Sequence, residues 1–414
     1  MSCLRHRVIG SAAAAAALLA LTVPAAAAST PGAAHRAQRV TEASTQAGTG
    51  INDNFSGDAC TSSSFCMAVG NYGSNGRAVG LAERLTGGGS WVVTAPVVSP
   101  PHGWNVFANE VACASPASCL FVGSHWAGQT GPSANLAEFW NGTSWQIVTA
   151  PAPVPKGIAG LTDVACPTTK FCLVTGQAGL SGRGQAAAYT WTNGTKWARI
   201  SVPHPRGALN SELGGLGCFN ASNCMAVGDY QKRLGHSIPF AARWHNGRWQ
   251  LLTTPSVPGQ RLTEFQAVSC PAATLCVAAG ETVENTRHSF VHAFAEVWSG
   301  AKWRVSTLRK APSQFLGISC PARNRCFAAG VTFPSSTAYA HALVETWNGR
   351  TWTAQRPVET AAPRAGDVMY HVACVNRATC EAVGFRFNPK SNAEATVAEK
   401  WNGHRWALQT TVNP

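Results

Sequence analysis

The feature that most constrains this chain is a set of evenly spaced cysteine pairs. Apart from Cys3, the cysteines form seven pairs whose members are always six positions apart: Cys60/Cys66, Cys113/Cys119, Cys166/Cys172, Cys218/Cys224, Cys270/Cys276, Cys320/Cys326 and Cys374/Cys380. Successive pairs begin 50 to 54 residues apart. A period of this length indicates repeated supersecondary units that stack on one another, here numbered repeats 1 to 7 after their cysteine pairs.

Two interpretations of the cysteine pairs compete, a disulfide and a metal site. A metal site would take four ligands from two pairs, but neighbouring pairs lie a whole repeat apart. Exported cysteines at a short, even spacing usually oxidise instead. We therefore predict one local disulfide per repeat, each contributing about 2 kcal/mol, and we expect no metal and no cofactor.

The text around each pair predicts four short strands. An apolar residue lies two positions before the first cysteine in six repeats, which indicates a first strand ending at that cysteine. The second cysteine opens a second strand, which we expect to end at a recurring glycine: Gly70, Gly123, Gly176, Gly228, Gly280, Gly330 and Gly384. The third strand ends at a tryptophan in six repeats, and the fourth begins near another after a turn that is often Asn-Gly. These repeated tryptophans are most simply packing residues.

Seven four-stranded units without a helical segment between them predict an all-β fold, a seven-bladed β-propeller of antiparallel blades with one disulfide-clamped hairpin per blade. We expect it to span residues 51–414. Residues 1–28 carry Arg5 and Arg7, then an Ala/Leu run and an Ala-x-Ala site, which predicts a secretory signal peptide. Residues 29–50, rich in Ala, Ser, Thr and Gly, are expected to form a flexible leader.

Composition excludes several function classes. The net charge of +13 falls to +11 when Arg5 and Arg7 are removed, and only 12% of the residues are charged. A mild excess spread over a large surface argues against a nucleic-acid binder. Outside the signal, no stretch is long and apolar enough to cross a bilayer. We therefore expect a secreted, extracellular monomer whose partner is an extracellular glycan or protein.

One turn carries a resemblance to a known family. Residues 190–197 read Thr-Trp-Thr-Asn-Gly-Thr-Lys-Trp, which is similar to the Ser-x-Asp-x-Gly-x-x-Trp turn of propellers with Asp-box or BNR-type repeats. With the Val-x-Cys and Ala-Val-Gly strands, each unit also resembles a blade of the photosystem assembly-factor propellers. The resemblance covers residues 51–414 and implies a propeller architecture. The Asp itself is missing from every turn, so the resemblance does not extend to a sialidase-like activity.

A binding face follows from the strand order. If the first strand of each blade is innermost, the cysteine hairpins emerge on one face, and the second-to-third and fourth-to-first connections emerge on the other. This second face, here called the variable-loop face, carries unlike loops and is the candidate binding face. On it we expect His102, Trp104, His125 and Trp126 to approach one another. Exposed indoles beside histidines suit stacking on a sugar ring, and a small apolar loop core is the alternative.

Acid and base candidates lie on the innermost strands. Glu110 and Asp163 occupy equivalent positions in adjacent repeats, and His371 occupies the same position in repeat 7. They are the candidate catalytic residues, although no nucleophile or metal cluster accompanies them, and solvated carboxylates are the simpler interpretation. We therefore expect an exported, non-catalytic binding protein. The alternatives are an extracellular carbohydrate-active enzyme, a glycoside hydrolase or lyase, and an assembly scaffold for a protein partner.

Overall fold

The computed structural model describes residues 53–414 except 75, 88, 97–103, 128–132, 152–156, 181–182, 234, 256, 287–289, 335–339, 356, 358–365, 389–390 and 392. The expected signal peptide (1–28), the leader (29–50) and His102 lie outside the described residues. Within them the chain forms 27 β-strands and no α-helix. The described part therefore holds no helix that is long and apolar enough to span a membrane.

The strands follow the repeats. Repeats 1 to 4 contain β1 (Asn54–Ser62), β2 (Phe65–Ser74), β3 (Arg77–Leu85), β4 (Trp91–Val93), β5 (Trp104–Ser115), β6 (Ser118–Ala127), β7 (Ser133–Trp140), β8 (Trp145–Ile147), β9 (Ile158–Thr168), β10 (Phe171–Leu180), β11 (Arg183–Thr192), β12 (Lys196–Ile200), β13 (Asn210–Asn220), β14 (Asn223–Arg233), β15 (His236–His245) and β16 (Arg248–Leu252). Repeats 5 to 7 contain β17 (Gln260–Ala272), β18 (Leu275–Glu284), β19 (Val291–Trp298), β20 (Trp303–Ala322), β21 (Arg325–Thr332), β22 (His341–Trp347), β23 (Trp352–Gln355), β24 (Gly366–Asn376), β25 (Thr379–Asn388), β26 (Ala393–Trp401) and β27 (Trp406–Gln409).

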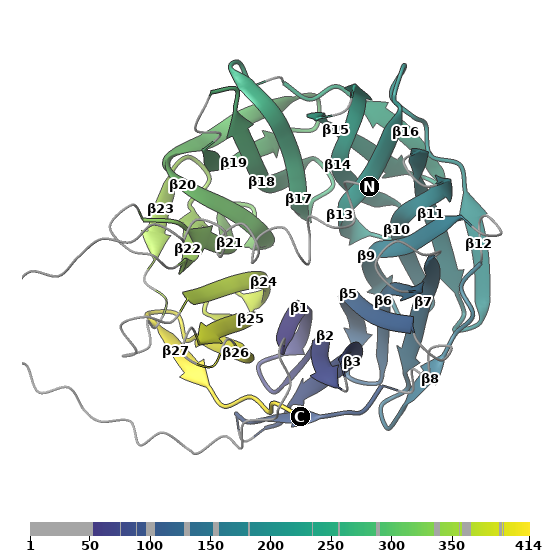
Figure 1. The fold of residues 1–414 in the computed structure, drawn as a ribbon, viewed down its shortest axis with the longest axis vertical. Helices are drawn as coiled ribbons and strands as arrows, with labels where there is room; N and C mark the ends of the chain where they lie inside the picture. Colours follow the sequence, from purple (N-terminus) through teal and green to yellow (C-terminus); the bar gives the residue numbers. More distant parts are fainter. Residues whose placement is uncertain are drawn as a thin grey trace, which may run out of the picture.

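Each repeat pairs its strands antiparallel in chain order. Repeats 1, 2, 3 and 7 form separate four-stranded sheets, and repeats 4 to 6 are joined in one sheet of eleven described strands. One parallel bridge, Ser237 to Leu262, links β15 to β17. The 20-residue strand β20 is both the last strand of repeat 5 and the first of repeat 6. The sheets surround a common centre with β1, β5, β9, β13, β17 and β24 innermost (Figure 1), as in a β-propeller.

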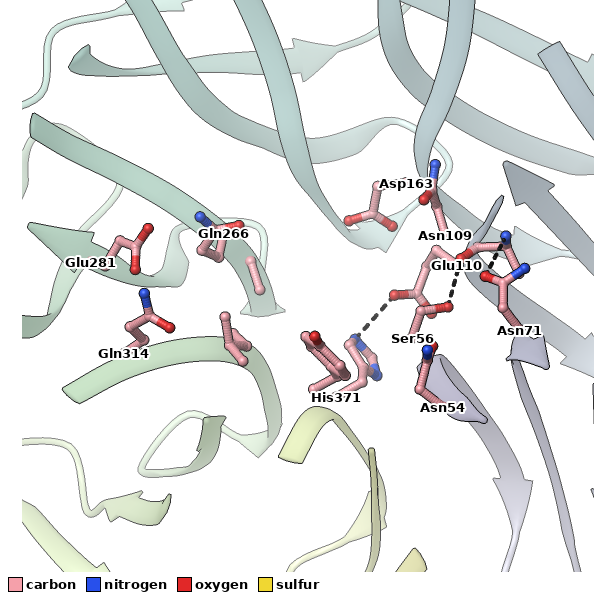
Figure 2. Close-up of a pocket in the computed structure, with 14 residues that line it drawn as sticks. Asn54, Ser56, Asn71, Asn109, Glu110, Asp163, Gln266, Glu281, Gln314 and His371 are labelled. Atoms are coloured by element: carbon pink, nitrogen blue, oxygen red, sulfur yellow. Dashed lines mark hydrogen bonds and ion pairs between the residues drawn. The ribbon is translucent and has the colours of Figure 1, made fainter. Parts of the chain in front are cut away.

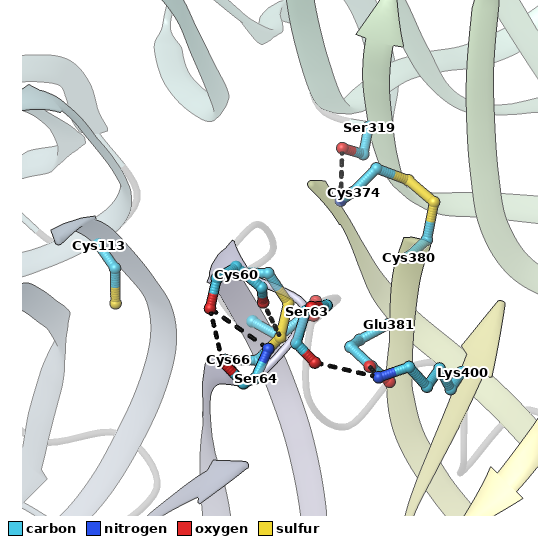
Figure 3. Close-up of a disulfide and its surroundings, with 12 residues drawn as sticks. Cys60, Ser63, Ser64, Cys66, Cys113, Ser319, Cys374, Cys380, Glu381 and Lys400 are labelled. Atoms are coloured by element: carbon cyan, nitrogen blue, oxygen red, sulfur yellow. Dashed lines mark hydrogen bonds and ion pairs between the residues drawn. A yellow bond between two sulfur atoms is a disulfide. The ribbon is translucent and has the colours of Figure 1, made fainter. Parts of the chain in front are cut away.

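The predicted disulfides are confirmed. Each of the seven bridges joins cysteines six positions apart, and Cys60 lies directly opposite Cys66 in the β1–β2 ladder. Figure 3 shows the hairpin of repeat 1 beside repeat 7, where Lys400 Nζ donates to the Ser63 carbonyl at 3.2 Å. The same ammonium lies 3.3 Å from the Glu381 carboxylate. The bridged hairpins therefore also contribute to contacts between repeats.

The second cysteine of each pair is a core residue. This cysteine lies near the start of the second strand, which packs between neighbouring sheets, and its side chain is buried among apolar residues in every repeat. The seven buried second cysteines, each at most 4% exposed, are Cys66, Cys119, Cys172, Cys224, Cys276, Cys326 and Cys380. These sulfurs are therefore core groups with a structural role and not part of a ligand-binding surface.

The strand limits differ from the prediction at the recurring glycines. Each innermost strand continues two residues past its first cysteine, and the second strand does not end at the glycine, since β2 runs through Gly70 to Ser74. A Cβ on Gly70 would lie 1.8 Å from the Asn54 carbonyl oxygen of β1. In repeat 6, a Cβ on Gly330 would lie 1.9 Å from the Gln314 oxygen. The glycine therefore marks a close approach of two backbones rather than a strand end.

A β-bulge in the innermost strand accompanies this approach. In β1 the pairing with β2 passes from Phe55 to Gly57 and leaves Ser56 unpaired. The ladder register makes the same skip four residues before the first cysteine in the other repeats, at Asn109, Thr162, Gly214, Gln266, Leu316 and Tyr370. Because a bulge bends its strand and redirects its side chains, it can turn extra groups toward the centre of the molecule.

The bulge residues also connect neighbouring repeats. Ser56 Oγ donates to the Ala108 carbonyl of repeat 2 at 2.7 Å, and Asn109 Nδ2 donates to the Leu161 carbonyl of repeat 3 at the same distance. Thr162 Oγ1 donates to the Leu213 carbonyl of repeat 4. In these three repeats, a polar side chain at the bulge therefore hydrogen-bonds the innermost strand of the next sheet.

The repeated tryptophans pack the sheets together, as predicted. In six repeats the third-strand tryptophan lies opposite the fourth-strand one, with ring centroids 5.5 to 6.4 Å apart. Trp140 and Trp145 of repeat 2 join the same buried cluster as Phe65 and Met67 of repeat 1. Burying these large rings between sheets removes much apolar surface from water and supplies a major part of the stabilisation.

Repeats 7 and 1 contact each other without exchanging a strand. The first and last sheets each use four strands of their own repeat, and they lie side by side in Figure 1. Trp91 Nε1 donates to Gln409 Oε1 at 2.9 Å, and the Val412 amide donates to Glu83 Oε2 at 3.1 Å. His371 of β24 also pairs with a carboxylate of β1, and this contact leads to the candidate site.

Candidate functional site

A small polar pocket lies at the centre, where the innermost strands meet (Figure 2). Its volume is about 70 Å³, and described residues of six repeats line it. Five amide side chains contribute: Asn54, Asn71, Asn109, Gln266 and Gln314. The acidic residues are Glu110, Asp163 and Glu281, and Tyr370 and His371 lie beside them. The lining is therefore rich in hydrogen-bonding groups.

The bulges build this lining. In repeats 2, 5 and 7 the bulge residue and its successor both line the pocket: Asn109 with Glu110, Gln266 with Ala267, and Tyr370 with His371. In a regular strand, successive side chains point to opposite faces. The bulge turns two consecutive residues toward the centre, so six short strand segments can surround one cavity.

His371 connects two acidic residues. Its Nδ1 lies 2.8 Å from Asp58 Oδ1, and its Nε2 lies 3.4 Å from Glu110 Oε2. Gly57 has no side chain to block this contact, since a Cβ there would lie 2.2 Å from Glu110 Oε1. The structure therefore brings His371 into contact with both Asp58 and Glu110 at the centre of the molecule.

The proton affinities of this group are shifted. Burial raises the pKa of Glu110 to about 8, although nearby His371 opposes the shift. Burial alone would lower the pKa of His371, but Glu110 and Asp58 outweigh it and raise the value to about 9. The imidazole is therefore held in its charged form, a poor state for a general base at neutral pH.

Asp163 lies in the same pocket, but both of its oxygens accept backbone hydrogen bonds. Oδ1 accepts from the Val164 amide at 2.6 Å, and Oδ2 accepts from the Leu216 amide of repeat 4 at 2.7 Å. Glu110 Oε1 likewise accepts from the Val111 amide at 3.0 Å. The three catalytic candidates therefore lie around one cavity, where they form a network that ties repeats together.

A polar position directly after the strand glycine supplies two further pocket residues, and it was not singled out from the sequence. Asn71, Ser124, Gln177, Asp229 and Glu281 each come directly after the recurring glycine of their repeat. Asn71 and Glu281 line the pocket. Aligning the repeats on their glycines would have revealed this polar position. It was missed because the strand was expected to end at the glycine.

The predicted aromatic platform is not assembled as expected. Trp104 pairs with Ala127, and Trp126 pairs with Asn105, so the two indoles leave opposite faces of the sheet. Trp126 Nε1 donates to Ser124 Oγ at 2.9 Å, and both tryptophans are half-buried. His125 pairs with Val106 on the face that Trp104 uses, and burial lowers the pKa of its imidazole. The register therefore does not bring the two indoles together on one surface.

Metal ligation finds no support within the described ranges, where no group of three or more His, Cys, Asp or Glu side chains has the geometry to hold an ion.

Comparison with known proteins gives the fold and no family. No protein-family model matches the sequence, and no curated protein matches it. Among solved structures, a polysaccharide lyase of family PL25, an ulvan lyase, is 10% identical, with a TM-score of 0.55 over 87% of this chain and 97% of that chain. The lyase bound to -[GlcA(1-4)Rha3S]- is 9% identical, with a TM-score of 0.54 over 83% and 91% of the two chains.

A third similar structure is the acylaminoacyl peptidase of Pyrococcus horikoshii, which is 8% identical, with a TM-score of 0.52 over 86% of this chain and 52% of that chain. At such identities the likeness extends to the fold alone, and no activity follows from it.

Proposed function

We propose that this protein is an exported, non-catalytic binding protein that holds part of a glycan in the central pocket of a closed, seven-bladed β-propeller. The observation that carries the proposal is the lining of that pocket, where amide, hydroxyl and carboxyl groups of six repeats surround one cavity. Amide side chains both donate and accept hydrogen bonds, as sugar hydroxyls do. A small number of placed polar groups in a cavity is the usual basis of ligand specificity.

The size of the pocket limits what enters it. A volume of about 70 Å³ holds a handful of waters, so the edge of one sugar unit fits and the rest of a glycan would extend outward. On the variable-loop face, Leu180 is 63% exposed, and Leu209 and Phe290 are each 47% exposed. Apolar side chains there suit the apolar faces of sugar rings. We also assign contacts with the emerging glycan to Trp104 and Trp126, acting separately, and to His102 and His125.

The closed ring and the export rest on separate observations. Side-chain hydrogen bonds join repeat 7 to repeat 1 at Trp91 and Glu83, which supports closure by packing. The bridged cysteines and the predicted signal peptide support an oxidising, extracellular location. Backbone amides donate hydrogen bonds to the carboxyl groups of Asp163 and Glu110. Because these groups hold the backbone in place, they support a binding protein rather than an enzyme.

Screening the purified secreted protein against a glycan panel tests this function. We expect binding to a subset of glycans without release of products. Gln266→Ala, in the pocket, should weaken binding at least about tenfold, equivalent to 1.4 kcal/mol. Gln250→Ala, on the exposed outer strand β16, is the matched control and should bind normally.

Two results would favour the alternatives. Product formation that Glu110→Gln abolishes without unfolding would make the protein an enzyme. Co-purification of a single exported protein, insensitive to free sugars, would make it a scaffold.

A further inference from the structure

In repeats 1 and 3, the residue after the strand glycine holds two neighbouring repeats together. In repeat 1, Asn71 Nδ2 donates to the Val106 carbonyl at 2.6 Å, and Asn71 Oδ1 accepts from the Ala108 amide at 3.1 Å. In repeat 3, Gln177 Nε2 donates to the Ser211 carbonyl at 3.1 Å. An amide at this position therefore ties the second strand of one repeat to the innermost strand of the next.

Repeats 4 and 5 place an acid at the same position, Asp229 and Glu281. A carboxylate has no donor for a carbonyl. Asp229 Oδ2 and Glu281 Oε2 are both buried and have no hydrogen-bond partner among the described residues. Because a buried polar atom without a partner destabilises the fold, an amide would serve the structure better here. The acid at position 281, which lines the pocket, is therefore better explained by a ligand.

A second unpartnered acceptor lies beside Glu281. Gln314 is only 8% exposed, and its Oε1 is buried without a hydrogen-bond partner in the described part of the chain. Figure 2 shows its amide nitrogen toward the Glu281 carboxyl, which leaves the oxygen for the cavity. Both residues line the pocket. A ligand group that donates more than one hydrogen bond would satisfy both of these buried acceptors.

The acidic groups around Glu281 and Gln314 favour a positively charged hydrogen-bond donor. Glu264 lies directly opposite Glu281 in the β17–β18 ladder. None of the described lining residues is Lys or Arg, and His371 is already paired with Asp58 and Glu110. Burial and the neighbouring Glu264 raise the pKa of Glu281 to about 8. A cation entering the pocket would favour the ionised form of the Glu281 carboxyl, which burial disfavours.

We propose that the bound glycan carries a free amino group, and that its ammonium binds between Glu281 and Gln314. This inference rests on the proposed glycan-binding function. An ammonium has three N–H donors and a positive charge, which match a carboxylate and an amide oxygen without donors. The amides on the other walls, such as Asn54 and Asn109, remain for the hydroxyls of the same sugar.

Three oligosaccharides of equal length and β-1,4 linkage test the inference by titration calorimetry on the secreted wild-type protein. They are built from glucosamine, N-acetylglucosamine and glucose, so they differ only in carrying a free amine, a blocked amine or a hydroxyl. We expect the glucosamine oligomer to bind at least about tenfold more tightly than the other two, a difference of 1.4 kcal/mol.

The outcomes separate the two proposals. Equal binding of all three sugars, or a preference for the blocked amine, overturns the amine inference and leaves glycan binding intact. Failure of all three also overturns the inference. If the wider glycan panel is negative as well, the proposed function fails with it.

The variant Glu281→Gln adds a readout that a purely structural role would not give. Because Gln177 already fills the equivalent place in repeat 3, the variant should fold, and its melting temperature should rise. The preference for the glucosamine oligomer over the glucose oligomer should fall below about threefold. Glu284→Gln, on the same strand but outside the pocket, should keep the preference. A Glu281→Gln protein with the full preference would contradict the assignment.

Discussion

Gly57 lies on β1, the innermost strand of repeat 1, between Glu110 of repeat 2 and His371 of repeat 7. With no side chain there, the imidazole reaches across repeat 1 to the Glu110 carboxylate at 3.4 Å. A methyl group at this position would meet the end of a flexible side chain rather than backbone. The contact can therefore be broken by one substitution without a large change in the surrounding backbone.

Gly57→Ala should displace the Glu110 carboxyl and lower the pKa of His371 from about 9 toward its ordinary value of 6.5. Following the imidazole resonances by NMR during a pH titration measures this shift. Gly87→Ala, where no atom lies within 4 Å of the added carbon, is the control. An unchanged His371 titration in Gly57→Ala would show that Glu110 is not its partner.

Asp163→Asn should destabilise the protein by about 1–3 kcal/mol. An asparagine keeps one acceptor oxygen, so its amino group would face the backbone amide of either Val164 or Leu216. Urea unfolding measures the loss. If stability is unchanged, the two hydrogen bonds do not tie repeat 3 to repeat 4 as described.

At the residue scale, spacing from a cysteine shows which side chains occupy equivalent positions in different repeats. Glu110, Asp163 and His371 all lie three residues before a first cysteine, and the structure gathers them at one cavity. Glu281 and Gln314 were missed because their importance depends on unpaired atoms and on a strand that continues past its glycine. Sequence patterns record residue types and not hydrogen-bond partners.

At the scale of the strand, the glycine and the bulge act together. At the bulge the ladder register skips one residue of the innermost strand, and the carbonyl two residues before it lies against the glycine of the second strand. Both features recur at fixed distances from the cysteines. Each repeat therefore has the same backbone pattern where its innermost strand faces the centre of the molecule. The turn and strand signals were sufficient to predict the four strands per repeat, but nothing in the strand pattern indicated a bulge.

Gly330→Ala should cost about 1–3 kcal/mol or more, because its Cβ would lie 1.9 Å from the Gln314 carbonyl oxygen. Gly366→Ala is the matched control, since the nearest atom there lies at 3.5 Å, and we expect a change within about 0.5 kcal/mol. Thermal unfolding of both variants measures the difference. Similar melting temperatures would contradict the close approach of β20 and β21.

Replacing Cys218 and Cys224 together with alanine should lower the stability by about 2 kcal/mol, the loop-closure value for so short a loop. Because each bridge is local, peptide mapping of the variant under non-reducing conditions should find the other pairs unchanged. A new bridge between two repeats would mean that the pairing is not set within each hairpin.

At the scale of the whole molecule, charge is segregated. Eleven acidic side chains are buried, whereas Lys and Arg are absent from the buried residues of the described chain. Burial raises the pKa of Glu83, Glu110, Glu281, Glu296 and Glu381 to about 8 each. The all-β architecture and its repeats were readable from the sequence, but this segregation was not, because burial depends on how the sheets pack.

The raised values predict a pH dependence with a definite sign. Between the ordinary glutamate value of 4.5 and about 8, the folded protein holds protons that the unfolded chain has lost, so its stability falls as pH rises. His371, raised from 6.5 to about 9, has the same sign in its own window. We expect the melting temperature to be highest near pH 5 and at least about 5 °C lower at pH 9. Scanning calorimetry at constant ionic strength measures it, and a flat or rising profile would contradict the burial of these carboxyls.

The bulge of the innermost strand has a consequence for redesign. The bulge residue is left out of the strand ladder and, in five repeats, lines the cavity. The sequence already places Ser, Asn, Gln, Leu and Tyr there on one backbone pattern. A library of variants at these positions alone would leave the tryptophan layers and disulfides unchanged. Variants that bind new ligands could then be selected by changing the cavity lining in one repeat after another.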